Sequence, residues 1–488
     1  MRRPGPGLPV ASQAVEHALR FDVGPTFRLP RLPGTPIAPG TFVSTYYDTS
    51  DHRLARAGVT VCRRTGGRKH RWQVELPHGG ERIEVAGPGA PGPPPEALGQ
   101  LLPVYTRGAE LVPVATLATR RSGMLVRGIE GPVARVVLDR VSVLDGPDGM
   151  QQFREIEVEP LGKDEEALDR LGVLLEASGA RPGLSHPQLF RAIGLDPPRE
   201  PAAPSASAPT VDHVRAMMRV QRDGIRTHDP GTRLGSDPED LHKMRTAVRR
   251  LRAILRAARP VFHGEWVEDL RRELDWLGGA LGAVRDLDVL LASLRGEVAA
   301  FDRSERAASQ RFLDRLEAER ASARTDLLAA LNDPRYFALL DKLDDAVDRS
   351  EGSAAVISLA DIAAAEFKKL RKAVERLPEE PSDGDMHAVR IKVKRARYTA
   401  ELAEPLAGRA AERFIARARA LQDVLGEHQD AVVAEQRLRA LFEGARGRRA
   451  AFVAGRLVER QRSRRVAARN AFLERWKKVE RRGRKAWG

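Results

Sequence analysis

The chain of 488 residues is too long for a single hydrophobic core, and its 42% hydrophobic residues predict globular folding into two or more domains. The formal net charge of +15 is unevenly spread, because residues 1–200 hold 25 Lys and Arg against 23 Asp and Glu, whereas the rest holds 57 against 44. A basic excess confined to the second part suits nucleic acid, polyphosphate or an anionic membrane, and it also fits a soluble Arg-rich chain without a particular ligand.

A single cysteine, Cys62, excludes an internal disulfide and fits a reducing cytoplasm. The N-terminal segment lacks the apolar stretch of a signal peptide. No run of about 18 apolar residues occurs in the sequence, so we expect no membrane span. We therefore expect a cytoplasmic protein.

The first part of the chain has the alternating apolar pattern of β-strands, interrupted by Gly and Pro. One helix is predicted at residues 163–179, where Gly179 would end it. A segment rich in Pro, Ala and Ser at 196–210 predicts a linker, so we expect a β-rich domain at 10–195. The predicted strands are 59–64, 71–76, 134–143 and 153–159.

The region 211–488 has a different pattern, in which Leu, Val and Ala recur three and four residues apart, as helices of a bundle require. Prolines fall mostly between the helical stretches, including Pro230, while Pro405 could interrupt a helix. The predicted helices are 211–227, 238–260, 265–298, 304–331, 335–348, 358–377, 385–403, 409–442 and 449–482.

This helical region contains an internal duplication. LHKMRTAVRRLRAIL at 241–255 aligns with MHAVRIKVKRARYTA at 386–400 at a constant offset, and WLGGALGAVRDLDVL at 276–290 aligns with LQDVLGEHQDAVV at 421–433. Two elements that repeat in the same order predict two related helical halves that face each other. The matched polar pairs are His242 with His387, Arg245 with Arg390, Arg249 with Lys394, Arg250 with Arg395, Arg252 with Arg397, and Asp286 with Asp430.

In each copy the basic residues form a stripe beside an apolar stripe, at about 100° per residue. Such a stripe borders the buried face, so it predicts the wall of a groove between helices. A single Arg on a helix usually pairs with a nearby Asp or Glu. A duplicated stripe of like charges instead favours a bound polyanion, which histidine protonation would strengthen. The candidate binding residues are His242, Arg245, Arg249, Arg250, Arg252, Arg256, His387, Arg390, Lys394, Arg395 and Arg397, with Arg222, Lys369 and Lys372 from accompanying stripes.

The motifs DPEDLHKMRTAVRRLR, LGAVRDLDVL, MHAVRIKVKRARY and LGEHQDA resemble those of the CHAD family, the conserved-histidine α-helical domains. The resemblance implies two four-helix halves around a basic channel, polyphosphate as the ligand without a cofactor, and association with polyphosphate granules. Gln429 departs from the pattern, because it stands where the first copy has Arg285, and it could weaken the second copy.

The motifs YYDTSDHRLARAGVTVCRR, WQVELP, LATRRS and FREIEVEP resemble the CYTH family, the triphosphate tunnel enzymes. The resemblance implies an antiparallel β-barrel with a charged tunnel and hydrolysis of triphosphates with Mg²⁺ or Mn²⁺. Three carboxylates share one face of a strand and suit hard divalent cations, or else form an outward acidic face. The implied phosphate-binding residues are Arg63, Arg64 and Arg121, and the candidate metal ligands are Glu16, Glu155, Glu157 and Glu159.

The first-strand signature of this family, Glu-x-Glu-x-Lys, is altered here to Glu16-His-Ala18-Leu-Arg20, and Glu75 stands where a lysine is common. Loss of a metal carboxylate and a phosphate-binding lysine predicts reduced, altered or lost catalysis.

The prediction is thus an α+β protein of two domains, an antiparallel β-barrel followed by an all-α bundle of two duplicated four-helix halves at 211–488. The leading hypothesis for its function is polyphosphate binding. One alternative is a triphosphatase or polyphosphatase dependent on Mg²⁺ or Mn²⁺, to which the helical module recruits substrate. Another is a protein that binds the nucleic-acid backbone, since stripes almost without aromatic residues argue only against base stacking.

Overall fold

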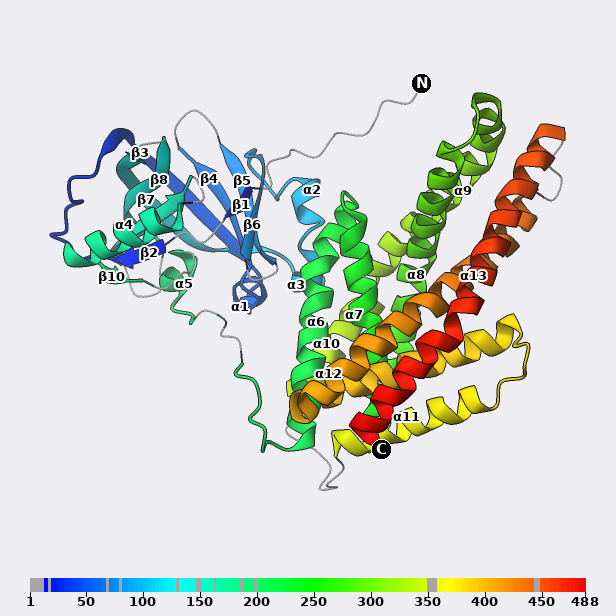
Figure 1. The fold of residues 1–488 in the computed structure, drawn as a ribbon. Helices are drawn as coiled ribbons and strands as arrows, with labels where there is room; N and C mark the ends of the chain where they lie inside the picture. The colour runs from blue at the N-terminus through cyan, green and yellow to red at the C-terminus, as the bar shows by residue number, and fades with distance from the viewer. Residues whose placement is uncertain are drawn as a thin grey trace. The chain divides into compact units, whose positions relative to one another are not determined.

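The structure is a computed structural model, and the chain divides into two compact units, Met1–Pro201 and Ala202–Gly488, which we describe separately (Figure 1). The division falls inside the segment predicted as a linker. The residues that the structure describes are 13–15, 19–66, 70–78, 81–128, 131–145, 151–161, 164–183, 188–196, 198, 201–262, 264–348, 358–442 and 448–488.

The first unit is a ten-stranded antiparallel sheet with the strand order β1-β6-β5-β4-β3-β7-β8-β9-β2-β10. The predicted antiparallel sheet is therefore confirmed. The pairings between described residues run in one line, and none of them joins β1 to β10 to close a barrel. The strands are β1 Gln13–Val15, β2 Leu19–Asp22, β3 Gly34–Asp48, β4 Thr60–Thr65, β5 Arg71–His78, β6 Glu81–Pro88, β7 Val112–Arg127, β8 Pro132–Val143, β9 Gln152–Pro160 and β10 Arg181–Pro182.

Four of these strands match the predicted ones, but the long central strand β3 was not expected, because Pro36 and Pro39 argue against a strand. The structure accommodates Pro39 in an irregularity, where the register with β7 shifts between Ile37 and Gly40. No ladder hydrogen bond is needed from a residue at such a shift.

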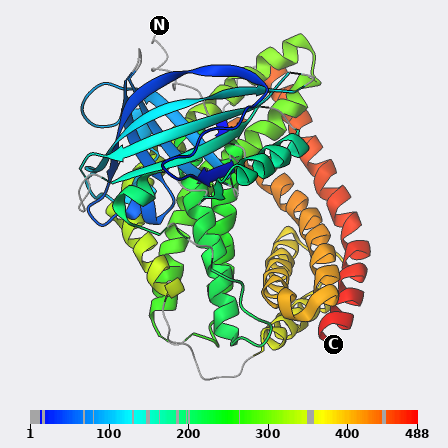
Figure 2. The same ribbon diagram turned by 90° about the vertical axis from the view of Figure 1, so that its left-hand side faces the viewer.

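One face of the sheet is apolar, and the other carries the charged residues beside a second apolar cluster that includes Leu117, Val141 and Val143. Ile156 and Val158 of β9 are fully buried beneath Leu171 and Leu175 of α4 (Glu165–Ala177), which lies across the sheet in Figures 1 and 2. Because side chains alternate along a strand, the β9 carboxylates lie on the opposite face. The remaining helices of this unit are α1 Arg53–Arg56, α2 Glu96–Gly99, α3 Pro103–Thr106 and α5 Gln188–Ile193.

Among its described residues, the second unit contains helices and their connections but no strand, as predicted. No helix of the described chain is long and apolar enough to cross a membrane. The helices are α6 Thr210–Leu234, α7 Pro238–Ala257, α8 Trp266–Ala299, α9 Arg303–Asn332, α10 Pro334–Asp348, α11 Leu359–Glu375, α12 Asp383–Phe442 and α13 Arg448–Trp487.

Helix α12 consists of two helices joined at Gly408, which has non-helical angles of φ 57° and ψ −145°. Arg397, before the kink, contacts Gln422 after it, and His387, which lies further before the kink, contacts Gln429, which lies further after it. The two segments therefore run antiparallel. Together with α11 and α13, these two segments make four helical segments in the second half, which correspond to the four helices α6 to α9 of the first half (Figure 2).

Each predicted helix of this region is present, but the first is longer than expected. Pro230 lies inside α6 instead of after it. The helix continues because Asp229 and Arg233 are buried and paired with each other, and Tyr336 of α10 donates a hydrogen bond of 2.9 Å to Asp229. These tertiary contacts outweigh the hydrogen bond that proline removes.

Candidate polyanion-binding site

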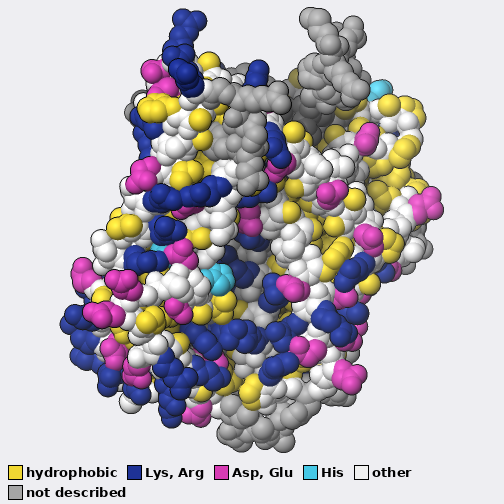
Figure 3. Space-filling view, turned by 90° about the vertical axis from the view of Figure 1, so that its right-hand side faces the viewer, with side chains coloured by type: hydrophobic (Ala, Val, Ile, Leu, Met, Phe, Trp, Pro, Cys, Tyr) yellow, Lys and Arg dark blue, Asp and Glu magenta, His cyan; other side chains and the backbone are white. Residues whose placement is uncertain are grey.

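A cavity of about 860 Å³ lies between α7, α8, α11 and α12 in the helical unit, and we call it the basic groove. On the face drawn in Figure 3, Lys and Arg side chains gather around a hollow in this unit. Of the lining residues that the structure describes, only Asp361 and Glu366 are acidic. Its basic lining residues are Arg249, Arg252, Arg256, Arg259, Arg271, Lys369, Lys392, Lys394 and Arg395.

The groove is positioned by the apolar faces of its helices. On α7, Val248 and Leu251 are buried, so the neighbouring side chain of Arg249 reaches the groove wall. On α12, Val393 and Ala396 are buried, and Lys394 and Arg395 line the same cavity. The structure therefore brings together basic residues from both copies of the sequence repeat.

Positive charges crowd one another in this region. Burial, together with Arg390, Arg249 and Arg245, lowers the pKa of Lys394 to about 7, while Asp430 acts in the opposite direction. Burial also lowers the pKa of Arg390, which Asp430 partly offsets and Arg249 reinforces. The positive charges therefore repel one another and are only partly compensated by Asp430, and an anion would relieve the rest of this repulsion.

Several guanidinium groups of the site have unused donors. No described residue accepts a hydrogen bond from the buried Nε atoms of Arg249, Arg390 and Arg395. A buried donor without a partner costs about 1–3 kcal/mol. Because the protein almost fully covers these Nε atoms, an anion in the groove would have to bind the accessible part of Arg249 and Arg395, the two of these arginines that line the cavity. Arginine forms short, charge-assisted hydrogen bonds with phosphate oxygens.

Other candidate residues are paired with exposed acids. Arg245 lies 3.0 Å from Asp286, and Arg252 lies 2.5 Å from Asp275; the two carboxylate side chains are 68% and 65% exposed. Pairs with such exposed carboxylates contribute at most about 1 kcal/mol, so a polyanion could displace them.

The two histidines of the repeat differ in their surroundings. His242 is half-buried, and its pKa is lowered by burial and by Arg285. His387 is exposed, and its Nδ1 lies 2.7 Å from Oε1 of Gln429. The residue that departs from the repeat, Gln429, is therefore the partner of the second histidine, whereas Arg285 opposes protonation of the first.

Four predicted residues have other surroundings. Arg222 is paired with Asp344 of α10 at 3.2 Å. Arg397 is buried and donates hydrogen bonds to Glu401 and Gln422, which gives it a structural role. Arg250 lines a separate cavity of about 260 Å³, and Lys372 is exposed on α11.

Three further residues line the groove that were not predicted from the sequence, namely Arg259, Arg271 and Lys392. Lys392 lies two residues before Lys394, off the predicted stripe. Arg259 and Arg271 both pair with Glu268, at 2.5 and 2.7 Å. Nothing in the repeat could have identified these two, because their place depends on how α8 crosses α7.

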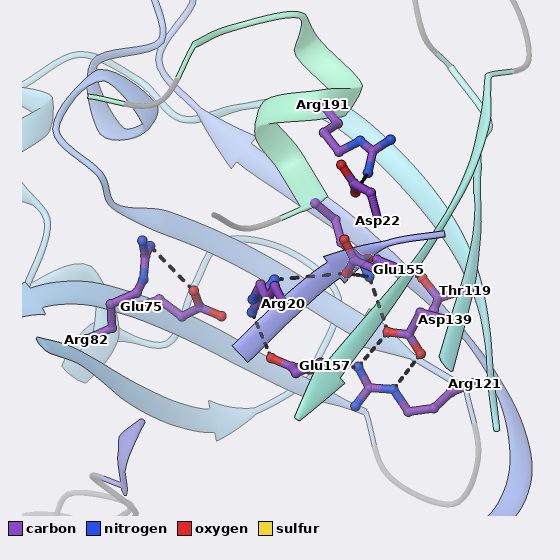
Figure 4. Close-up of polar contacts among 11 residues, drawn as sticks. Arg20, Asp22, Glu75, Arg82, Thr119, Arg121, Asp139, Glu155, Glu157 and Arg191 are labelled. Atoms are coloured by element: carbon purple, nitrogen blue, oxygen red, sulfur yellow. Dashed lines mark hydrogen bonds and ion pairs between the residues drawn. The ribbon is translucent and has the colours of Figure 1, made fainter. Parts of the chain in front are cut away.

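The polar face of the first unit carries a second cluster of arginines, drawn in Figure 4. Arg20 lies 2.7 Å from Glu157, and Arg121 donates hydrogen bonds of 2.8 and 2.7 Å to the two carboxylate oxygens of Asp139. Gln188 donates to Glu155 at 2.7 Å. Each of these three carboxylates is therefore already engaged by a side chain of the protein.

The predicted phosphate-binding residues of this unit divide between the two faces of the sheet. Arg64 lies 4.5 Å above the ring of Phe42 and, like Arg121, belongs to the polar face. Arg63 points the other way, since strand neighbours alternate, and its Nε donates to the carbonyl oxygen of Gly89 at 3.0 Å.

The residues present do not fit a divalent metal ion. Arg20 lies 2.7 Å from Glu157 and 4.0 Å from Glu155, where its guanidinium supplies the positive charge. Burial raises the pKa of Glu157, but Arg20 and Arg121 outweigh it and lower the value. Within the described part of the chain, no group of three or more acidic, His or Cys residues could hold a metal ion.

The other two predicted metal ligands add nothing to this face. Glu159 is partly exposed and lies 3.4 Å from Arg135. Glu16 lies outside the described residues.

The motif YYDTSDHRLARAG, which carried part of the resemblance, builds local structure. Asp48 is fully buried, and its carboxylate accepts hydrogen bonds from the backbone N–H groups of Thr49, Leu54 and Ala55. It thereby fixes the turn that leads from β3 into α1.

Comparison with known proteins agrees with this division of the chain. The family model of the CYTH domain matches residues 25–186, and that of the CHAD domain matches residues 216–439. The uncharacterized protein MT2285 of Mycobacterium tuberculosis is 31% identical over 429 residues, which cover 80% of each chain.

Two solved structures are similar to part of the chain. PptA from Streptomyces chartreusis is 24% identical, with a TM-score of 0.48, over 55% of this chain and 100% of its own. The CHAD domain from the plant Ricinus communis is 26% identical, with a TM-score of 0.47, over 57% of this chain and 94% of its own.

Proposed function

Since this chain belongs to the family of proteins that join an N-terminal CYTH domain to a C-terminal CHAD domain, we propose that it binds inorganic polyphosphate in the basic groove. One observation carries the proposal: Arg249 from the first copy of the repeat and Lys394 and Arg395 from the second copy line one cavity, where the charges of Arg390, Arg249 and Arg245 act on Lys394. A bound polyanion would neutralise this repulsion and accept hydrogen bonds from the lining cations.

The chemistry of the groove favours polyphosphate over nucleic acid. Polyphosphate is a flexible thread with about one negative charge per phosphate, so it needs only cations and hydrogen-bond donors at regular intervals. Single-stranded nucleic acid is usually held by aromatic side chains that stack on its bases. Among the described residues that line the groove, Tyr398 is the only aromatic one, and it is buried.

The proposal is tested by binding of long-chain polyphosphate to a variant in which Arg245, Arg249, Arg390 and Lys394 are replaced by Ala. Loss of several charge-assisted hydrogen bonds predicts an affinity about a thousandfold lower and a shallower dependence on salt. The matched control removes the same net charge from exposed residues, through replacement of Arg272, Arg311, Arg315 and Arg475 by Ala. Equal affinities of the two variants, with both folded, would contradict the proposal, as would displacement of polyphosphate by duplex DNA at equal phosphate concentration.

We also infer that the CYTH domain does not hydrolyse triphosphates with metal assistance. Supporting this inference, its described carboxylates are engaged by Arg20, Arg121 and Gln188, and Ala18 replaces a family carboxylate. We expect no phosphate release from tripolyphosphate with Mg²⁺ or Mn²⁺. Release that disappears in Glu155→Gln and Glu157→Gln variants would overturn the inference and restore the enzymatic alternative.

Association with polyphosphate granules in the cytoplasm is a further expectation of the proposed function. It requires only that the groove accept a stretch of chain at a granule surface, because many phosphates are displayed there together. Co-sedimentation of the full chain with granules, but not of the groove variant, would support it.

A further inference from the structure

We propose that Lys394 is a reactive nucleophile that acyl phosphates acylate inside the basic groove. Lys394 lies on the first segment of α12, is half-buried, and lines the cavity with Arg249 and Arg395. The inference does not depend on polyphosphate being the ligand, because it concerns the amine and the electrophile alone.

The surroundings of the amine favour its neutral, nucleophilic form. Burial lowers its pKa to about 7, and the charges of Arg390 on the same helix and of Arg249 and Arg245 on α7 act in the same direction. Asp430, on the second segment of α12, opposes them. On α11, Glu366 and Lys369 line the same cavity and pair with each other at 2.6 Å.

Protonation state is what limits an ordinary lysine as a nucleophile. A typical lysine has a pKa of about 10.4, so at neutral pH its fraction of neutral amine is about a thousandfold smaller than that of an amine with a pKa near 7. A weaker base is also a weaker nucleophile, which offsets part of this gain. The remaining advantage favours Lys394 as a nucleophile at neutral pH.

The groove selects the electrophile by charge. An acyl phosphate carries a reactive carbonyl group directly beside a phosphate, and the positively charged side chains of Arg249 and Arg395, which line the cavity together with Lys394, would attract that phosphate toward the amine. The aliphatic side chains of Ala253, Ala257 and Ile391 also line the cavity and provide an apolar surface for a small acyl group.

The reaction is a simple acyl transfer. The lone pair of Nζ attacks the carbonyl carbon, the bond between this carbon and the bridging oxygen breaks, and orthophosphate leaves with the electron pair. Nζ then loses a proton to solvent and is left as a neutral amide. Nothing is oxidised or reduced, and the groove loses the charge of one cation.

The test uses the full chain and acetyl phosphate at pH 7.5, with initial rates of acetylation at each lysine measured by peptide mass spectrometry. We expect Lys394 to react at least about tenfold faster than Lys392 and Lys478. Lys392 lines the same cavity, so it controls for attraction of the anion, and Lys478 is a surface lysine paired with Glu474. Equal rates at the three lysines would overturn the proposal.

The role of the surrounding cations is tested separately. Arg390→Gln should slow acetylation of Lys394 by at least about threefold, since it raises the pKa of the amine and weakens the attraction of the donor. Arg272→Gln, at an exposed position on α8, should leave the rate unchanged. The rate at Lys394 should reach half its maximum near pH 7, whereas a continued rise toward pH 10 would contradict the proposal.

Acetylation measured in the presence of polyphosphate distinguishes this inference from the proposed function. Protection of Lys394 by long-chain polyphosphate supports both. Rapid acetylation that polyphosphate does not slow supports the reactive lysine and counts against polyphosphate binding in this groove.

Discussion

The two units of this protein each contain a cluster of arginines, and the clusters differ in how completely their cations are paired. On the polar face of the sheet, Arg20 and Arg121 are matched by Glu157 and Asp139 at about the distance of a hydrogen bond. In the basic groove, four of the nine basic lining residues pair with acids, whereas Arg249, Lys394 and Arg395 form no ion pair with a described residue. Pairing, not the number of arginines, thus separates a stabilising network from a candidate binding site.

The same comparison explains why other basic stripes of the helical unit are poor candidates. On α13, Arg456 pairs with Glu305 at 2.6 Å, and Arg464 pairs with Glu427 at 2.6 Å. On α6, Arg226 pairs with Asp344. These stripes have the spacing of the groove stripe, but acids on neighbouring helices neutralise them.

The largest expected effect on polyphosphate affinity comes from pairing the arginines of the groove with carboxylates, as they are paired on the sheet face. Ala253→Glu with Ala257→Glu places two carboxylates in the groove and leaves every arginine in place. Because the carboxylates would pair with the arginines, we expect polyphosphate affinity to fall by about a hundredfold or more. Isothermal titration calorimetry gives the affinity. The Gln pair at the same positions keeps the size without the charge, and an equal loss in that variant would mean that steric blocking, not pairing, is the cause.

The next effect is on stability, and it has opposite signs in the two units. Arg20→Ala leaves Glu157 in a partly buried site without its nearest cation, so we expect a loss of about 2–3 kcal/mol in the free energy of unfolding. Arg390→Ala removes a partly buried cation and its repulsion with Arg249, and it should leave stability unchanged or raise it. Urea unfolding measures both. A loss of similar size in the two variants would remove the distinction between the units.

A smaller effect is a pH dependence confined to the groove. Bound polyphosphate favours the charged form of Lys394, so the contribution of this residue to affinity is full below its pKa of about 7 and is lost as pH rises above that value. We expect about tenfold weaker binding of long-chain polyphosphate at pH 8.5 than at pH 6. Lys394→Arg keeps the charge at every pH and should flatten the profile; an unchanged slope in this variant would assign the dependence to the histidines.

The smallest effect concerns the difference between the two copies. Gln429→Arg restores the residue of the first copy, adds one cation and removes the partner of His387. Because the site is exposed and screened, we expect an affinity gain of only about twofold to threefold. Competition binding against the parent chain can resolve such a change, and a decrease would show that the contact with His387 matters more than the added charge.

Much of this architecture could be predicted from the sequence, because periodicity and repetition are properties of single elements. Residue spacing predicts the helices of the second unit and the antiparallel sheet. It also predicts that Arg249 and Lys394 line the same groove. Strand β3 was missed, because the register shift that accommodates Pro39 depends on its partner β7. The ion pair that neutralises Arg222 could not be predicted for the same reason, since its partner Asp344 lies 122 residues further along the chain.

The kink at Gly408 gives the helical hairpin of the second half a tighter turn than the α7–α8 hairpin of the first half. In the first half, α7 ends at Ala257 and α8 begins at Trp266, so a connecting segment joins the two antiparallel helices. In the second half one glycine makes the same reversal, with angles that only glycine adopts without strain. An inserted residue near Gly408 would rotate one helix of the hairpin against the other, whereas the α7–α8 connection can absorb one. Relatives of this protein should therefore vary in length between α7 and α8 while keeping a glycine, and a constant length, at the turn of the second hairpin.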